Sequence, residues 1–514
     1  MKNKQLIINL VASVVVFLVQ LVISFWLSPY IVKKLGEEAN GFITLANNFV
    51  QYATLVSVAV NSMSGRFISI EYNKGEKQKA KEYFSSVFWM NVILSALIFV
   101  ISVVLICYLE YVVNISEELV WDVKVTFVIS FANLIVSFLG TVFSAATFVT
   151  NRMDLNSYRQ IVANLIKVFV IALCFMCFQP RIYFVSLAAL VMGIYTLIAN
   201  IHLTHRLTPE FDVSLKNFQW AKIKTLVSAG SWMLVSNLSN LLLNGFDLFI
   251  ANRFVEPDAM GRLSVSKQLP IAISSLLSFF SSIFSASFTE LVARNAWEEL
   301  LNEIKFTLKI LALVLTVPFA GIIVYGTEFL TLWLPESVYG RSDIRQVYIL
   351  MILELSVVIA NAYMYSIHSV FIALNKVKKY SILILVSGIT SIVVTLLLVT
   401  NTSLGVYAIA GTSTLILAGV NTVLVPLIAA YAMKIKPARL MGTIYKSYAI
   451  LGVTCVMFYL IKNLLWFQNW GQFIVSALIA GIIGYCLNIW LLLSKEERRR
   501  LIEKIRKRTE KKNA

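Results

Sequence analysis

The stretch Asn237-Leu-Ser-Asn240-Leu-Leu-Leu-Asn244-Gly-Phe-Asp247 places three amides and a carboxylate in an otherwise apolar segment. At about 100° per residue, these four side chains fall within roughly 80° of one another on a helix. Because such a stripe is costly in lipid, we expect it to face protein or water. The next segment also has polar residues on one face, namely Ser264, Lys267, Gln268, Ser275, Ser278, Ser282 and Ser285. Two neighbouring polar-faced membrane helices predict a hydrated cavity inside a bundle.

The composition indicates a polytopic membrane protein. Of 514 residues, 59% are hydrophobic and only 14% are charged, whereas a soluble domain is about one quarter charged. The net charge of +17 comes mainly from alternate loops and the C-terminal tail, which is the positive-inside pattern, so we expect no nucleic-acid partner. The cysteines and histidines form no metal set or disulfide framework. We expect no cofactor, no bound metal and no enzymatic activity.

Apolar windows of about twenty residues predict about fourteen membrane helices. They lie near 6–30, 42–64, 85–109, 127–149, 161–178, 183–204, 225–250, 264–287, 305–326, 347–373, 380–400, 405–431, 446–465 and 471–493. One lysine, Lys167, falls inside a span. Most other basic residues lie in the loops on the side of the two termini, so we expect both termini to be cytoplasmic.

A loop motif occurs twice, at Tyr30–Gly41 and at Phe249–Gly261. Each copy ends a long span, carries basic and then acidic residues, and closes with glycine before a polar-faced helix. The repeat predicts two six-helix lobes related by an axis along the membrane normal. The expected order is an N-lobe (1–206), a cytoplasmic linker (207–224), a C-lobe (225–433), two further helices (434–493) and a basic cytoplasmic tail (494–514) that opens with a capping-box sequence, Ser494 to Glu497.

The N-lobe has polar stripes that match those of the seventh and eighth spans. One lies on the first predicted helix and the other on the second: Asn9, Ser13, Gln20 and Ser24, then Thr44, Asn47, Asn48, Gln51 and Thr54. In transporters built from such repeats, the substrate site lies between the lobes.

Several of these features together resemble a known family. They are the twelve plus two spans, the turn Lys34-Leu-Gly-Glu-Glu-Ala-Asn-Gly41-Phe, Arg66 at the first large cytoplasmic loop, and Leu330-Thr-Leu-Trp333-Leu. The chain resembles the polysaccharide-exporter branch, the Wzx-like O-antigen and capsule flippases, of the multidrug/oligosaccharidyl-lipid/polysaccharide (MOP) flippase superfamily. The resemblance implies an all-α, MATE-like fold with a cavity lined by the first, second, seventh and eighth helices. It also implies flipping of undecaprenyl-diphosphate-linked oligosaccharides to the outer leaflet.

The predicted site follows from these two lines of reasoning. Amides can hydrogen-bond sugars in either sense, and cations suit a diphosphate. The expected substrate-binding residues are Gln20, Asn47, Asn48, Gln51, Arg66, Asn237, Asn240, Asn244, Asp247, Lys267 and Gln268, with Asp247 and Glu354 as candidates for ion coupling. The expected partners are the lipid-linked oligosaccharide, membrane lipids and a polysaccharide polymerase or assembly machinery. We expect a monomer in a bacterial plasma membrane.

Other interpretations stay open. A cation-coupled drug exporter needs a buried carboxylate, for which only Asp247 and Glu354 qualify. A lipid II flippase is a second alternative, but the lipid II flippases that this chain resembles carry several arginines in their first helices, and no arginine precedes Arg66 here. A flippase for teichoic-acid precursors is a related alternative. A polymerase or ligase would need a longer external loop than Thr327–Gln346. The polar stripes are also compatible with interhelical packing, and Lys267 with snorkelling to the interface or pairing with Asp247.

Overall fold

The computed structural model describes residues 2–275, 296–373, 377–433, 435–464 and 469–494, with residues 277, 288, 291, 292, 294, 497 and 498. Within these residues the regular structure is entirely helical. Some expectations lie outside the described residues: the serines at 278, 282 and 285, most of the basic tail, and the side chains of Asn9, Ser13 and Asn244.

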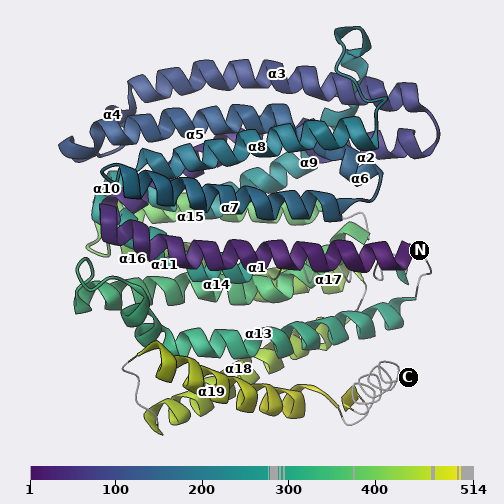
Figure 1. Ribbon diagram of the computed structural model, residues 1–514. Helices are drawn as coiled ribbons and strands as arrows, with labels where there is room; N and C mark the ends of the chain where they lie inside the picture. Colours follow the sequence, from purple (N-terminus) through teal and green to yellow (C-terminus); the bar gives the residue numbers. More distant parts are fainter. Residues whose placement is uncertain are drawn as a thin grey trace, which may run out of the picture. The chain divides into compact units, whose positions relative to one another are not determined.

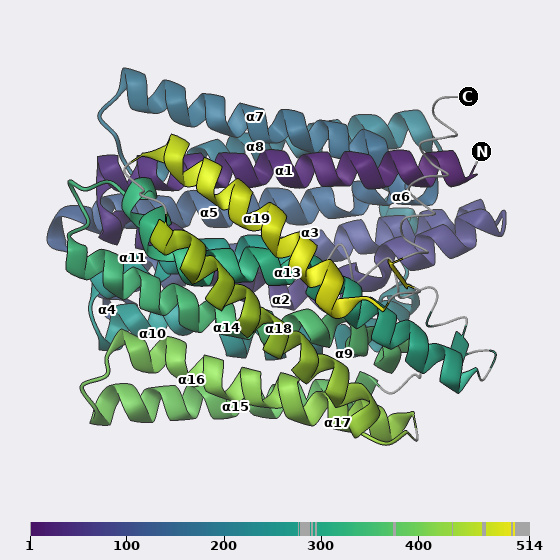
Figure 2. The ribbon, with the colours of Figure 1, turned by 90° about the horizontal axis from the view of Figure 1, so that it is seen from below.

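The helices follow one another with short connections (Figures 1 and 2). In the first half they are α1 (Lys2–Leu35), α2 (Glu37–Asn73), α3 (Lys77–Cys107), α4 (Leu109–Val112), η1 (Glu117–Leu119), α5 (Val120–Thr141), η2 (Val142–Ser144), α6 (Ala145–Val149), α7 (Met153–Cys177), α8 (Tyr183–Leu207), η3 (Leu215–Asn217), α9 (Trp220–Asn244), α10 (Asp247–Phe254) and α11 (Pro257–Ser266). In the second half they are α13 (Trp297–Trp333), α14 (Arg341–Ala373), α15 (Val377–Asn401), α16 (Val406–Gly419), η4 (Val420–Leu424), α17 (Val425–Ala432), α18 (Ala438–Leu464) and α19 (Trp470–Leu492).

Twelve helices in the described part of the chain are long and apolar enough to cross a membrane. They coincide with twelve of the predicted spans. Helix α14 covers the expected span at 347–373, and the span at 264–287 begins in α11 and continues beyond the described residues. The predicted all-α, multi-pass membrane fold is therefore confirmed. Helices extend past the predicted spans because hydropathy marks only the segment that lies in hydrocarbon.

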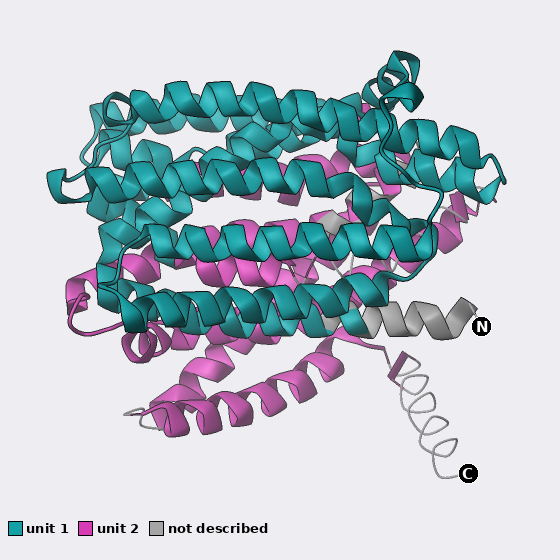
Figure 3. Ribbon diagram, turned by 45° about the horizontal axis from the view of Figure 1, so that its top comes forward, with its two compact units in different colours: residues 1–265, 381–409 teal, residues 266–380, 410–514 magenta. Residues whose placement is uncertain are grey.

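By packing, the chain forms two compact units, residues 1–265 with 381–409 and residues 266–380 with 410–514 (Figure 3). In the first unit, Phe84 packs edge-on to Phe143 and stacks on Phe211. In the second unit, a core cluster includes Leu311 and Leu355. The division into six-helix lobes rests on the sequence repeat and stays a prediction.

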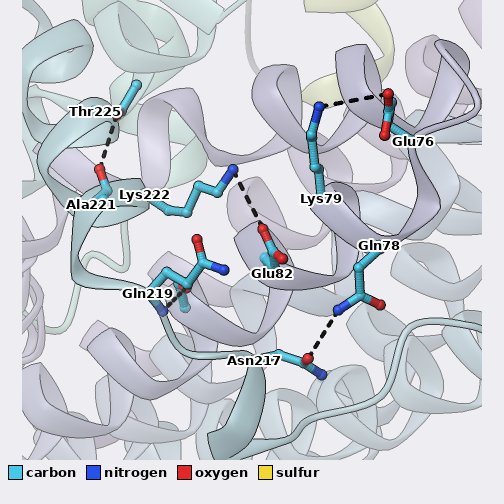
Figure 4. Close-up of polar contacts among 10 residues, drawn as sticks. Glu76, Gln78, Lys79, Glu82, Asn217, Gln219, Ala221, Lys222 and Thr225 are labelled. Atoms are coloured by element: carbon cyan, nitrogen blue, oxygen red, sulfur yellow. Dashed lines mark hydrogen bonds and ion pairs between the residues drawn. The ribbon is translucent and has the colours of Figure 1, made fainter.

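The connection between α8 and α9, residues 208–219, is bound to the first turns of α3. Four polar pairs join this segment and the start of α9 to α3, three of which are ion pairs: Lys77–Glu210 (2.7 Å), Lys81–Asp212 (2.6 Å), Gln78–Asn217 (3.3 Å) and Glu82–Lys222 (3.5 Å). Figure 4 shows the last two, with Glu82 and Lys222 reaching toward each other. The hydrogen bond from Lys77 lowers the pKa of the Glu210 carboxyl because it favours the charged form. The linker is therefore held against α3.

Candidate functional site

The polar stripe of the seventh span contains a break in the helix. Gly245 and Phe246 separate α9 from α10, and the Gly245 carbonyl accepts hydrogen bonds from Asn48 Nδ2 (3.3 Å) and the Tyr52 hydroxyl. The Tyr52 ring also stacks on Phe246, with centroids 4.9 Å apart. Non-helical backbone at membrane depth persists only where other groups satisfy it. Helix α2 supplies those groups, so Asn48 has a structural role at this break.

Glycines bring α2 and α9 into close contact along their length. A Cβ on Gly230 would lie 2.1 Å from the Ala59 carbonyl oxygen, and one on Gly245 would lie 3.2 Å from the Tyr52 ring. Residue numbers rise along one helix as they fall along the other, so the two helices are antiparallel. Close approach through small residues is the usual way in which membrane helices pack.

Four of the predicted site residues are exposed on this helix pair. They are Asn47 and Gln51 on α2, and Asn237 and Asn240 on α9. The close contacts show which side of each helix faces the other. Counting about 100° per residue from that side places Asn47, Gln51 and Asn240 on the same side of the helix pair. Asn237 and Asn240 also donate to Met233 O (2.8 Å) and Ser236 O (3.0 Å) of their own helix. The α2–α9 pair therefore presents an amide-rich surface.

Lys267 and Glu354 form an ion pair in the second unit. Their Nζ and Oε1 atoms are 3.3 Å apart, and the side chains are only 11% and 9% exposed. Lys267 lies just after the end of α11, and Glu354 lies midway along α14. This burial excludes snorkelling for Lys267. The partner could not be predicted, because 87 residues separate the two and neither sequence context indicates the other.

Further along the same face of α14, seven residues from Glu354, Asn361 Oδ1 accepts a hydrogen bond of 2.5 Å from Asn421. Asn421 belongs to η4, a single π-helical turn. Such turns inside α-helices often occur at functional sites. The α14 face thus continues as a polar line from the ion pair to η4. Asn421 was not among the residues predicted from the sequence.

The remaining predicted residues lie in different places. Asp247 is buried in the first turn of α10, where the helix dipole favours a carboxylate. Gln268 is partly buried just after the end of α11. Arg66 is exposed near the end of α2 and makes no ion pair with any described residue. Gln20 lines a cavity within the first unit, between α1, α5, α7 and α8. The binding and ion-coupling roles of all these residues stay predictions.

The two copies of the repeated loop motif touch each other. A Cβ on Gly41 would lie 3.1 Å from the Cα of Gly261, and the hydroxyls of Thr44 and Ser264 are 2.7 Å apart. Glu37 and Arg262 add an ion pair of 3.9 Å. These contacts join the start of α2 to α11.

A second polar network closes the same end of the first unit. Asn114 and Asn252 exchange hydrogen bonds through both side chain and backbone: Asn114 N to Asn252 Oδ1 (2.8 Å) and Asn252 Nδ2 to Asn114 O (2.9 Å). Arg253 also donates to Asn114 Oδ1 (3.0 Å), and Ser116 donates to Glu38 (2.6 Å). The loop before α5 is thereby fixed to both copies of the motif. The sequence pattern did not predict this network, although Asn252 lies within the second copy of the motif.

Comparison with known proteins places the chain in a family. Residues 4–288, more than half of the chain, match the family model described as polysaccharide biosynthesis protein. The chain belongs to this family. A relative, the uncharacterised membrane protein EpsK of Bacillus subtilis (strain 168), is 28% identical over 97% of this chain and 98% of its own.

Solved structures with the same fold are transporters. An inward-facing multidrug resistance MATE family transporter of the MOP superfamily superposes with a TM-score of 0.68, at 12% identity over 82% of this chain and 96% of that chain. The lipid II flippase MurJ, in an inward closed conformation, gives 0.66 at 14% identity over 94% and 98%. The family model confirms the predicted relation to polysaccharide biosynthesis, and the solved structures confirm the predicted MATE-like fold.

Proposed function

We propose that this protein is a flippase that moves undecaprenyl-diphosphate-linked oligosaccharide units from the inner to the outer leaflet of a bacterial plasma membrane by alternating access. The family and the transporter fold support a flippase for polysaccharide assembly. The lipid-linked cargo, cytoplasmic termini, a monomeric state and a polymerase partner are finer parts of the proposal. They rest on the resemblance and the loop charges.

The observation that carries the proposal is the Lys267–Glu354 pair. A drug exporter for cations needs a membrane carboxylate that can bind its cargo, but Glu354 is 3.3 Å from a lysine. A buried pair of this kind keeps the empty site neutral, whereas a lone buried cation would be costly. An anionic cargo group can replace Glu354 on the ammonium, and a cationic drug would be repelled by it. The pair therefore favours an acidic cargo such as a diphosphate.

The rest of the cargo has matching surfaces. The exposed amides Asn47, Gln51, Asn237 and Asn240 suit sugar hydroxyls. In the second unit, an apolar cavity of about 390 Å³ lies among α13, α18 and α19, with Pro318, Tyr325 and Phe458 among its lining residues. Such a cavity can accept part of an isoprenoid chain by burial of apolar surface.

Deletion of the gene, followed by lipid analysis, tests the proposal. We expect lipid-linked oligosaccharide to accumulate on the cytoplasmic face, measured by its protection from membrane-impermeant reagents in intact cells. The wild-type gene should reverse this accumulation, and a Lys267→Gln, Glu354→Gln double variant of equal abundance should not. Unchanged glycolipid together with altered dye efflux would support the cation-coupled drug exporter instead. Accumulation of lipid II or of a teichoic-acid precursor would identify a different cargo.

A further inference from the structure

We propose that the first unit contains a second polar site, inside its helical bundle, that binds an acidic sugar residue of the cargo. The site is a cavity of about 310 Å³ between α1, α5, α7 and α8, within the range of small-ligand sites. The proposal rests on the proposed function, because it names the sugar class that the flippase carries.

Four amides line this cavity without using their side chains in the fold. Gln20, Asn133, Gln160 and Asn200 make no side-chain hydrogen bond with any described residue. Asn200 is only 8% exposed, and Asn133 Oδ1 is buried without a partner. Buried polar groups in native proteins are nearly always paired. Asn133 and Asn200 depart from this rule, and the exposed Gln20 and Gln160 lie on the same wall. The wall therefore offers unused hydrogen-bonding groups to a ligand.

The chemistry of the wall indicates a hydroxylated ligand. Each amide offers an acceptor and two donor hydrogens. The threonine hydroxyls on the wall already donate to their own helices, from Thr141 to Ser137 O and from Thr196 to Met192 O, so they offer acceptors. No charged side chain lines the cavity. A sugar ring, whose hydroxyls donate and accept in turn, matches this mixture.

Lys167 supplies the charge. It lies on α7 on the same helical face as Gln160 and Asn164, and this face is buried at Ala163 and Ile171. At 1.5 Å per residue, Lys167 lies about 9 Å inside one boundary of the predicted span at 161–178 and about 16 Å inside the other. It forms no ion pair or hydrogen bond with any described residue. An ionisable residue at this depth usually has a function.

The ring of the acidic sugar would therefore occupy the cavity between α1, α5, α7 and α8, with the sugar's carboxylate directed along α7 toward Lys167. Because nothing in the described fold neutralises Lys167, an acidic ligand gains more there than a neutral one. When no ligand is bound, replacing Lys167 by an apolar side chain removes an uncompensated buried charge and should stabilise the protein.

Binding by the purified full-length protein in lipid nanodiscs tests this inference, with glucuronate, glucose and acetate as probes. We expect glucuronate to bind about tenfold more tightly than glucose, corresponding to about 1.4 kcal/mol, and acetate to bind least. Lys167→Met should abolish the advantage of glucuronate and raise the unfolding temperature of the ligand-free protein. Asn200→Leu should weaken both sugars, and Lys167→Arg should retain the preference. Lys446→Met, at an exposed lysine of α18, is the matched control and should bind as wild type does.

Absence of sugar binding to the wild type, or an unchanged glucuronate preference in Lys167→Met, would overturn the inference. The lipid analysis of the deletion strain separates this failure from that of the proposed function. Accumulated lipid-linked oligosaccharide without glucuronate binding refutes only the second site. Glucuronate binding without accumulated glycolipid refutes the flippase.

Discussion

The hydroxyls of Thr44 and Ser264 lie 2.7 Å apart, although 220 residues separate them in the chain. Gly41 and Gly261, which are in backbone contact, have the same separation. In both contacts the residue numbers differ by the same amount, which means that α2 and α11 run parallel at this point. In antiparallel helices the sum of the two residue numbers would stay constant instead. Equivalent positions meet each other only on a two-fold axis. The two loop motifs therefore meet at equivalent positions, and the division into two lobes stays a prediction.

We expect a disulfide between Thr44→Cys and Ser264→Cys to form under mild oxidation in a protein whose natural cysteines are replaced. The two side chains already meet through their terminal oxygens, so sulfur atoms at the same positions can approach bonding distance. If this contact opens during transport, the disulfide will block export, and reduction will restore it. Thr44→Cys alone, treated with the same oxidant, is the control. Export that continues with the disulfide intact would show that the contact stays closed throughout the cycle.

Lys267→Gln should lower both stability and export. It leaves Glu354 buried without its cation, and breaking a buried pair costs about 3–5 kcal/mol. Adding Glu354→Gln should recover the unfolding temperature, measured in detergent, but not export, because the cation for the cargo is still absent. Lys267→Arg should retain both properties. Normal export by the double variant at equal abundance would exclude a role for the lysine in cargo binding.

Tyr52→Phe and Asn48→Ala should each destabilise the break between α9 and α10 by about 0.5–1.5 kcal/mol. The double variant should lose more than the sum, because in each single variant the other donor still satisfies the Gly245 carbonyl. Thermal unfolding of the four proteins measures this coupling. Tyr158→Phe, at a tyrosine that is 66% exposed, should change little. Additive losses would mean that the two donors do not share this role.

Cysteine labelling of intact cells tests the predicted orientation. Cysteines placed near Glu117 and Ser337 should react with an impermeant reagent from outside, whereas those at Lys77 and Lys504 should react only after the membrane is opened. The expectation follows from the excess of basic residues on the side of the termini. Labelling of Lys77→Cys in intact cells would reverse the orientation and with it the direction of the proposed transport.

The sequence was sufficient for the parts of the structure that depend on local pattern. Hydropathy located the helices, and the capping box is confirmed, since Ser494 N donates to Glu497 Oε2 (2.7 Å) and Glu497 N to Ser494 Oγ (3.2 Å). The break in the helix at Gly245 was not predicted. It depends on Asn48 and Tyr52, two distant donors to the Gly245 carbonyl, and a single glycine in an apolar segment does not reveal them. The partner of Lys267 and the unpaired amides around Asn200 depend on tertiary packing, which periodicity does not encode.

The linker held against α3 has a mechanical consequence. Three polar pairs attach residues 208–219 to the first turns of α3, and a fourth attaches the start of α9 there. We therefore expect this connection to move together with α3, as a rigid part of the first unit and not as a flexible joint between α8 and α9.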